Sequence, residues 1–172
     1  MPATFEDQLG IVKELLAEAQ RMERGERRHA AGPAPSGYER ELRLAGLAQR
    51  IAQAYTIIEG VLGFVARRID RTPVTGEEWH RKLIARCSQP FDESKRPALL
   101  SATLAEDLYE LCEFRHVVRN IYPTRLDESR VRENFDRLNR AVRAFAAECS
   151  TFAARLPPVK KARKIGVRAR FP

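Results

Sequence analysis

The chain has 172 residues, of which 44% are hydrophobic and 31% charged, a composition typical of a soluble helical protein. This length provides one domain with a proper core and is too short for two comfortable ones. The formal net charge is +8, but six basic side chains and no acidic one lie in residues 157–172, which leaves residues 1–156 at +2. No run approaches the roughly eighteen apolar residues that cross a membrane, and no signal-peptide pattern is present, so we expect no membrane contact and a cytoplasmic location.

An amphipathic helix is expected close to the N-terminus. Thr4 is a preferred N-cap residue, and Asp7 three residues later makes an imperfect capping box. Charged residues replace the apolar stripe near Gly25, where we expect the helix to fray. A loop rich in glycine and proline follows over residues 29–37. The stripe consists of Phe5, Leu9, Val12, Leu16 and Ala19.

The longest predicted helix covers residues 38–69. Gly46, Gly60 and Gly63 interrupt it, each at a cost of roughly 1 kcal/mol relative to alanine, which indicates close approach of another helix. Its apolar face widens in the second half, as expected either for core packing alone or for contact with both the core and a second subunit. The stripe consists of Leu44, Ala48, Ile51, Tyr55, Ile58, Leu62, Val65 and Ile69, and it is widened by Ile57, Val61 and Phe64.

A short third helix is predicted over residues 77–88. Within it we interpret Trp79 as a core residue and His80 as a surface residue. A polar loop with two prolines follows over residues 89–97, and Ser101 then stands at the N-cap position of the next helix.

The fourth predicted helix carries an arginine in its apolar stripe. The stripe runs from Leu104 to Tyr122 in steps of four and three, with Arg115 where an apolar residue is expected. A buried arginine without a partner costs several kcal/mol, so Arg115 must meet a carboxylate, a partner subunit or an anionic ligand. Within this chain the core carboxylates Glu59 and Glu113 are candidates. The polar residues that surround it near the helix end are His116, Arg119, Asn120 and Tyr122.

The last predicted helix begins at Asp127, a good N-cap residue, and its apolar stripe runs from Val131 to Leu156. No stretch alternates at the period of a strand, so the sequence predicts an all-α bundle of four long helices and a short one over residues 1–156. Residues 157–172 have too few apolar groups to fold alone, and we expect a disordered basic tail that holds RNA or an acidic partner weakly and in a salt-dependent way. The tail cations are Lys160, Lys161, Arg163, Lys164, Arg168 and Arg170.

The cysteines and histidines show no spacing typical of a metal site. Cys87, Cys112 and Cys149 are widely separated, and the last two fall within helical patterns, where a buried thiol is the ordinary interpretation. We therefore expect no metal and no cofactor.

Residues 114–122, which read Phe-Arg-His-Val-Val-Arg-Asn-Ile-Tyr, resemble the signature segment of HEPN-domain proteins, specifically of HepT toxins and HepT-like proteins. Residues 79–84, 96–101 and 126–131 resemble the same group, so the similarity covers residues 38–156 in order. It implies a helical bundle that forms a homodimer through its long helices, with a cleft at the subunit junction. It also implies metal-independent endoribonuclease activity, and a minimal nucleotidyltransferase antitoxin that attaches AMP to the motif tyrosine.

The HepT motif reads Arg-x4-His-x-Tyr, with a polar residue directly after the arginine. On this pattern Arg115 is the motif arginine and Tyr122 the AMP-accepting tyrosine, whereas Asn120 occupies the histidine position and His116 the polar position. Asparagine does not exchange protons near neutral pH. The nuclease hypothesis therefore assigns phosphate binding to Arg115, acid or base catalysis to His116, an orienting role to Asn120 and a second phosphate contact to Arg119.

Other interpretations stay open. The asparagine in the histidine position favours a non-catalytic HEPN-like module that dimerises and binds a nucleotidyltransferase or RNA without cleavage. A structural adaptor that binds its partner through the basic tail is a third hypothesis. In the purely structural alternative, Arg115 pairs with a core carboxylate, His116 caps or packs near a helix end, and Tyr122 fills the core.

Overall fold

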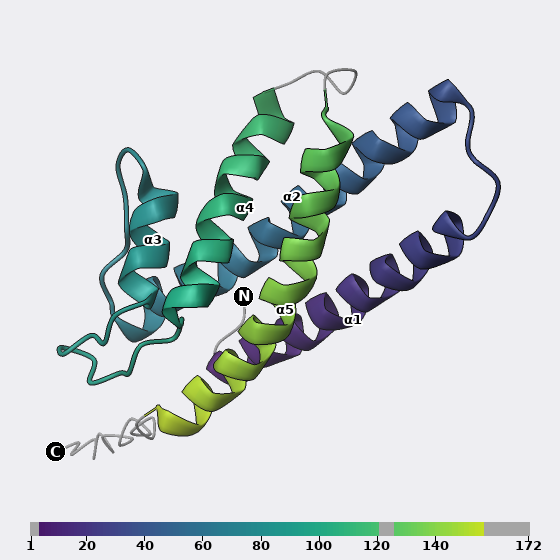
Figure 1. Cartoon of the computed structure of the whole chain (residues 1–172). Coiled ribbons are helices and arrows are strands. Elements are labelled where there is room, and N and C mark those ends of the chain that lie inside the picture. The colour runs from purple at the N-terminus through teal and green to yellow at the C-terminus, as the bar shows by residue number, and fades with distance from the viewer. Residues whose placement is uncertain (1–3, 121–125, 157–172) are drawn as a thin grey trace, which may run out of the picture.

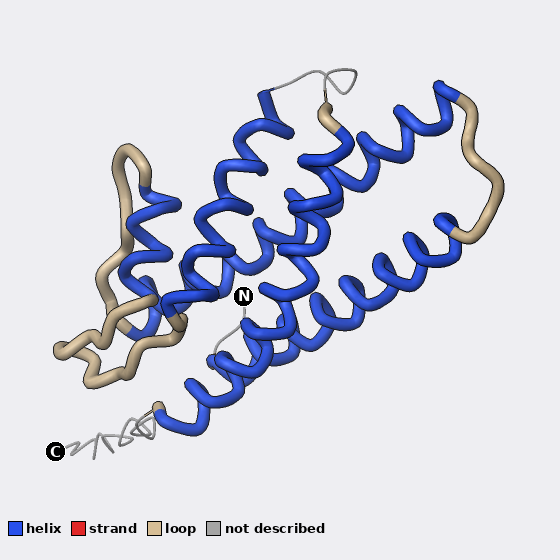
Figure 2. The backbone as a smooth tube through the Cα atoms, in the orientation of Figure 1, coloured by secondary structure: helices blue, strands red, loops and turns tan. Residues whose placement is uncertain are grey.

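The computed structural model describes residues 4–120 and 126–156 of the chain. Every regular secondary-structure element within these residues is a helix (Figures 1 and 2). The predicted all-α fold of four long helices and a short one is confirmed. The helices are α1 (Phe5–Ala30), α2 (Gly37–Phe64) with a π-helical turn η1 (Val65–Ile69), α3 (Trp79–Cys87), α4 (Ala102–Asn120) and α5 (Glu128–Arg155).

The four long helices share one core. Helices α1 and α2 run in opposite directions and separate toward the loop that joins them, while α4 and α5 lie across them (Figure 1). The most extensive packing is between α1 and α5, and α2 packs against both α4 and α5. The predicted stripe of α2 is buried except for its two ends, Leu44 and Ile69, and that of α5 is buried from Val131 to Phe152. The apolar periodicity of the sequence therefore identifies the core of this bundle.

The predicted caps start the helices as expected. The hydroxyl of Thr4 accepts a hydrogen bond from the Asp7 backbone, and the Asp7 carboxylate accepts one from the Thr4 backbone, so the capping box is complete. Ser101 and Asp127 accept hydrogen bonds from the first turns of α4 and α5. Each cap satisfies an N–H group that the helix itself leaves unpaired.

The predicted fraying of α1 near Gly25 is wrong, because the helix continues to Ala30. Its charged last turns are held by ion pairs from other helices. The Arg43 guanidinium of α2 contacts Glu26 at 2.5 Å, and Arg143 of α5 contacts Glu23 at 2.5 Å. The predicted loop over residues 29–37 is consequently shorter, since α2 already begins at Gly37.

The glycines of α2 do not mark a close approach within this chain. A Cβ atom added at Gly46 or Gly60 would meet nothing within 4 Å, and one added at Gly63 would meet the side chain of Arg67. The prediction that another helix of the bundle packs on them is therefore wrong for the described residues. At Gly60 the backbone of α2 instead lies open at the surface of the chain.

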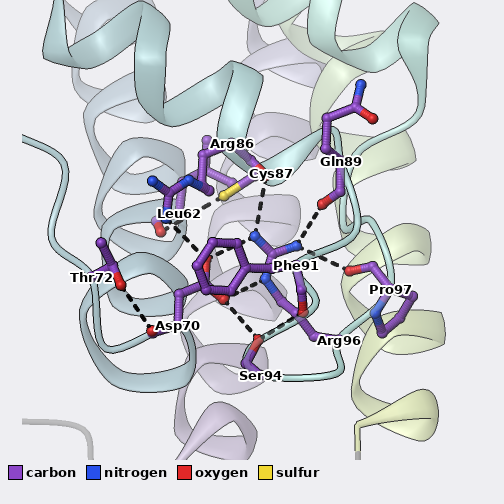
Figure 3. Close-up of polar contacts among 10 residues, drawn as sticks. All are labelled: Leu62, Asp70, Thr72, Arg86, Cys87, Gln89, Phe91, Ser94, Arg96 and Pro97. Atoms are coloured by element: carbon purple, nitrogen blue, oxygen red, sulfur yellow. Dashed lines mark hydrogen bonds and ion pairs between the residues drawn. The ribbon is translucent and has the colours of Figure 1, made fainter.

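A fully buried arginine fixes the loop that connects α3 to α4 (Figure 3). Arg96 donates two hydrogen bonds to the carboxylate of Asp70, at 2.6 and 2.8 Å. Its other three N–H groups donate to the backbone carbonyls of Gln89, Pro97 and Arg86, at 2.8, 3.0 and 3.1 Å. All five N–H groups of the guanidinium are thus paired, and α3 is held beside α2 and α4. We call Arg96, Asp70 and these three carbonyls the Arg96 cluster.

None of the helices in the described part of the chain is long and apolar enough to span a membrane.

Candidate functional site

Arg115 lies in α4 and points at the middle of α2. It is 7% exposed, and it continues the buried row formed by Leu104, Leu108 and Leu111. Its Nε donates a hydrogen bond to the Thr56 hydroxyl of α2 at 3.1 Å. The apolar stripe therefore carries the guanidinium to the α2–α4 interface, as the sequence predicts.

The chain supplies a carboxylate to Arg115 from Glu59, one turn after Thr56 on α2. Glu59 is 6% exposed, and its Oε2 lies 3.7 Å from the Arg115 Nη2 atom. That separation is an ion pair but is too long for a hydrogen bond. Glu113, the other candidate, instead pairs with Arg81 of α3 at 2.8 Å. The structural alternative for Arg115 is thus present in part, through one loosely placed carboxylate.

Arg115 keeps N–H donors that no described residue uses. Its one hydrogen bond to the described residues leaves from Nε, so both terminal nitrogens have donors to spare. The side-chain nitrogens that are both sealed from solvent and unpaired in the described part of the chain belong to His29 and Arg86. The terminal nitrogens of Arg115 are not among them, so these nitrogens keep donors without being sealed from solvent.

Two histidines from different helices meet beside Arg115. His116 follows Arg115 on α4 and is exposed. Its ring centroid lies 5.5 Å from that of His80 on α3, and the two planes are almost perpendicular at 88°. The interpretation of His80 as a surface residue is wrong, because its side chain is only 15% exposed and contacts Glu59.

His80 is held on two sides. Its Nδ1 is hydrogen-bonded to the Oε1 atom of Glu59. The indole of Trp79 stacks on the imidazole, with ring centroids 3.7 Å apart and planes 31° apart. Trp79 is 36% exposed, so its interpretation as a core residue is also wrong. Both residues follow Glu78, whose left-handed backbone at φ 54° starts α3 without a side-chain cap.

Two buried side chains near Arg115, those of Tyr55 and Cys112, are uncharged. Burial raises the pKa of the Tyr55 hydroxyl, and it likewise raises the pKa of the neighbouring Cys112 thiol. Both groups therefore stay protonated at neutral pH and contribute no negative charge. Among the described residues, Glu59 is the one that forms an ion pair with Arg115 and offsets its positive charge.

Asn120 and Arg119 lie one turn further along α4, and both are exposed. The amide nitrogen of Asn120 donates a hydrogen bond to the His116 carbonyl at 2.9 Å, so this amide is bonded to its own helix. Arg119 forms no ion pair with any residue of the described ranges. Tyr122 and the tail cations Lys160, Lys161, Arg163 and Lys164 lie outside the described residues.

Sequence reasoning named Glu59 of α2 as a carboxylate partner for Arg115, and the structure contains that ion pair. It missed the contact of Glu59 with His80 and the contribution of α3. For His80 the sequence gives no signal, since only the packing of α3 against α4 brings it to His116. No group of three histidine, cysteine or acidic side chains in residues 4–120 and 126–156 is placed to hold a metal ion.

Comparison with known proteins identifies the family of the chain. A family model described as "HepT-like protein" matches residues 46–156, which hold α2 from Gly46 onward and all of α3, α4 and α5. No curated protein and no solved structure matches the chain. The match covers more than half of the sequence and includes every residue of the cluster formed by Thr56, Glu59, His80, Arg115 and His116. The chain therefore belongs to the HepT-like family of HEPN-fold proteins.

Proposed function

We propose that this protein is a HepT-like toxin, an endoribonuclease that cleaves RNA without a metal ion. The observation that carries the proposal is the guanidinium of Arg115, which keeps unused N–H donors and is linked through Glu59 and His80 to the exposed imidazole of His116. A cation with free donors suits the scissile phosphate, and an imidazole is the side chain suited to proton transfer near neutral pH.

Cleavage in this proposal follows the chemistry that RNA itself offers. The 2′-hydroxyl oxygen attacks the adjacent phosphorus and the bond to the 5′-oxygen breaks, which leaves a 2′,3′-cyclic phosphate and a 5′-hydroxyl. One group takes the 2′-hydroxyl proton and another gives a proton to the leaving oxygen, so no metal is required. Arg115 stabilises the charge on the phosphate oxygens, and His116 transfers one of the two protons. Asn120 braces the turn of α4 that carries His116, through its hydrogen bond to the His116 carbonyl.

RNA binding extends beyond the reacting phosphate. Arg119 is exposed one turn after Arg115 and offers a second phosphate contact. In the basic tail, Lys160, Lys161, Arg163 and Lys164 add a charge-driven contribution that weakens as the salt concentration rises. The proposed location of this activity is the cytoplasm.

The proposed assembly is a homodimer formed over α2. Ile57 is 41% exposed next to Thr56, and Gly60 one turn later has open space above it. Ile11 of α1 and Phe64 of α2 line the same hollow. A second copy seated here would bury this apolar patch directly beside Arg115, which fits a cleft at the subunit junction. An Ile57→Glu variant is expected to be monomeric in analytical ultracentrifugation.

The proposed antitoxin is a small nucleotidyltransferase that adds AMP to Tyr122. In this proposal the added AMP blocks the binding of RNA. Intact-mass measurement after co-expression with a nucleotidyltransferase from the neighbouring reading frame tests this. An added AMP on the wild type that is absent from Tyr122→Phe is expected, whereas an adduct on both would place the modification elsewhere.

A second candidate function is a non-catalytic module that binds a nucleotidyltransferase or RNA. Two observations favour it. Asn120 stands at the histidine position of the motif with its amide bonded to its own helix, and Glu59 offsets part of the Arg115 charge. Expression of such a module would not slow cell growth.

Incubation of RNA with purified protein in EDTA separates the two candidates. The wild type is expected to produce fragments with 2′,3′-cyclic phosphate ends, and His116→Ala is expected to lose about 10²-fold or more in rate. His29→Ala, which changes a histidine at the far end of α1, is the matched control. Equal cleavage by wild type and His116→Ala would remove His116 from the mechanism, and absence of cleavage by the wild type would leave the binding module.

A further inference from the structure

We infer that His80 of α3 is the second proton-transfer group of this ribonuclease and that Glu59 of α2 is the positioning residue that holds it. The inference rests on the proposed function and completes it, since cleavage needs a base and an acid while the motif on α4 supplies one imidazole. With His80 included, one chain carries both.

The contact with Glu59 sets the chemical state of His80. An ionised carboxylate only accepts hydrogen bonds, so the Nδ1 atom of His80 is the donor and carries a proton. In the neutral ring the lone pair then belongs to Nε2, on the side away from Glu59. A histidine in this state is ready to accept a proton, and the carboxylate behind it stabilises the imidazolium that forms.

The positive charge of Arg115 helps to stabilise the buried carboxylate of Glu59. Glu59 is 6% exposed, and its two oxygens are divided between the His80 Nδ1 atom and the Arg115 Nη2 atom. An unpaired charge at such a depth would cost several kcal/mol. The same guanidinium thus offsets Glu59 on one side and keeps donors for phosphate on the other.

The two imidazoles are close enough to serve one phosphate. Their centroids lie 5.5 Å apart, and a hydrogen bond reaches about 3 Å from each ring. The oxygens attached to one phosphorus can therefore contact His80 and His116 at the same time. The two rings meet edge to face, with planes at 88°.

The protons balance over one turnover. Nε2 of His80 takes the proton of the 2′-hydroxyl as the bond from the 2′-oxygen to phosphorus forms. His116, protonated at the start, gives a proton to the 5′-oxygen as its bond to phosphorus breaks. His80 ends charged and His116 neutral, and exchange with water restores both, so no further reactant is consumed.

Trp79 restrains the ring and reports on it. Its indole covers one face of the His80 imidazole at 3.7 Å and it is the single tryptophan of the chain. Because a protonated imidazole quenches a stacked indole, the fluorescence of the unmodified protein reports the titration of His80. The groups that act on that titration are Glu59 of α2, Arg115, His116 and Glu113 of α4 and Arg81 of α3.

The test compares the pH dependence of RNA cleavage in EDTA for the wild type and for three histidine variants. The wild type is expected to give a bell-shaped profile, because the base must be neutral and the acid protonated. The His80→Gln variant is expected to be about 10²-fold slower, and its pH–rate profile should lack the part that rises with pH. The profile of His116→Gln should lack the part that falls with pH. His29→Gln should reproduce the wild-type profile. Glu59→Gln should lower the rate and displace the rising limb.

A second measurement needs no substitution. The midpoint of the Trp79 fluorescence titration of the wild type is expected to coincide with the midpoint of the rising limb of its cleavage profile. This comparison remains decisive if His80→Gln fails to fold. In a folded His80→Gln variant the fluorescence step should be absent, while His116→Gln should retain it.

The outcomes separate this inference from the function on which it rests. If the wild type cleaves RNA but His80→Gln keeps both limbs, or the two midpoints differ, His80 only packs against Glu59 and the inference is overturned while the ribonuclease stands. If the wild type does not cleave RNA, both are overturned. Loss of the rising limb together with coincident midpoints supports the assignment.

Discussion

Two buried arginines in this chain have opposite surroundings. Arg96 is 2% exposed and Arg115 is 7% exposed, so burial alone does not distinguish them. The guanidinium of Arg96 has every N–H group paired, two of them with Asp70 (Figure 3). Arg115 makes one hydrogen bond to the described residues, and the Glu59 carboxylate oxygen lies 3.7 Å from its Nη2 atom. A saturated guanidinium holds a loop in place, whereas one with donors left is prepared for an anion.

The comparison also shows what decides the use of a buried charge. In the Arg96 cluster the backbone carbonyls of one loop turn inward and satisfy the cation, so nothing from outside can compete. Around Arg115 the partners are side chains of α2, and α2 is open to solvent at Gly60 one turn beyond Thr56. The difference lies in the completeness of the hydrogen bonding and not in depth.

The largest expected effect is the loss of the Arg96 cluster. Arg96→Met should lower the free energy of unfolding by about 3–5 kcal/mol, because Asp70 would remain buried with only the Ser94 hydroxyl and the more distant Arg86 as partners. Urea unfolding followed by circular dichroism measures it. The double variant with Arg96→Met and Asp70→Asn should recover part of the lost free energy of unfolding, since the buried negative charge of Asp70 is then removed. A loss below about 1 kcal/mol would mean that the cluster does not hold the loop.

Alkaline pH should weaken the protein through the thiol beside this cluster. Burial raises the pKa of Cys87 from its usual 9.0 to about 12. The unfolded chain therefore loses this proton first, so the contribution of Cys87 to stability is complete below about pH 9 and is lost as the pH rises toward about 12. Between pH 8 and pH 10 the loss is expected to be about 1.4 kcal/mol.

The matched variant for this effect is Cys87→Ala, compared with the wild type by urea unfolding at both pH values. Its stability should fall less over the same interval, because the other buried acids, Cys149 and Tyr55, are common to both proteins. An equal fall in the two proteins would show that Cys87 ionises as easily in the folded state as in the unfolded chain.

Replacement of Arg115 should cost less stability than replacement of Arg96. Arg115→Met removes one hydrogen bond and the 3.7 Å ion pair with Glu59, but it places an apolar side chain in an apolar row and leaves Glu59 its contact with His80. We expect a loss of about 1–2 kcal/mol in the free energy of unfolding. A loss of 3 kcal/mol or more would show that Arg115 is a structural ion pair of the same kind as Arg96.

The last comparison concerns local opening of the two regions. Cys87 lies beside the Arg96 cluster and Cys112 behind Arg115, and both thiols are buried. With fewer hydrogen bonds closing the Arg115 region, Cys112 should react with an alkylating reagent about tenfold faster than Cys87 under native conditions, a difference of about 1.4 kcal/mol in opening free energy. Peptide mass spectrometry resolves the two. Faster labelling of Cys87 would reverse the order proposed for the two regions.

The same contrast explains what the sequence could predict. Periodicity and caps gave the helices because both depend on neighbours three and four residues apart, and they placed Arg115 in its row for the same reason. They correctly placed Arg96 in a loop but did not predict its burial, because its partners are Asp70, which directly follows η1, and backbone carbonyls that carry no sequence signal. They failed for His80 because its meeting with His116 depends on the packing of α3, which the Arg96 cluster fixes.

The central claim is that the spare donors of Arg115 hold the reacting phosphate. The most direct test measures the rate of RNA cleavage in EDTA at saturating RNA for the wild type and for Arg115→Gln, together with the unfolding free energy of each. The account predicts a rate at least about 10²-fold lower in a variant that remains folded. Cleavage by Arg115→Gln at the wild-type rate would contradict it.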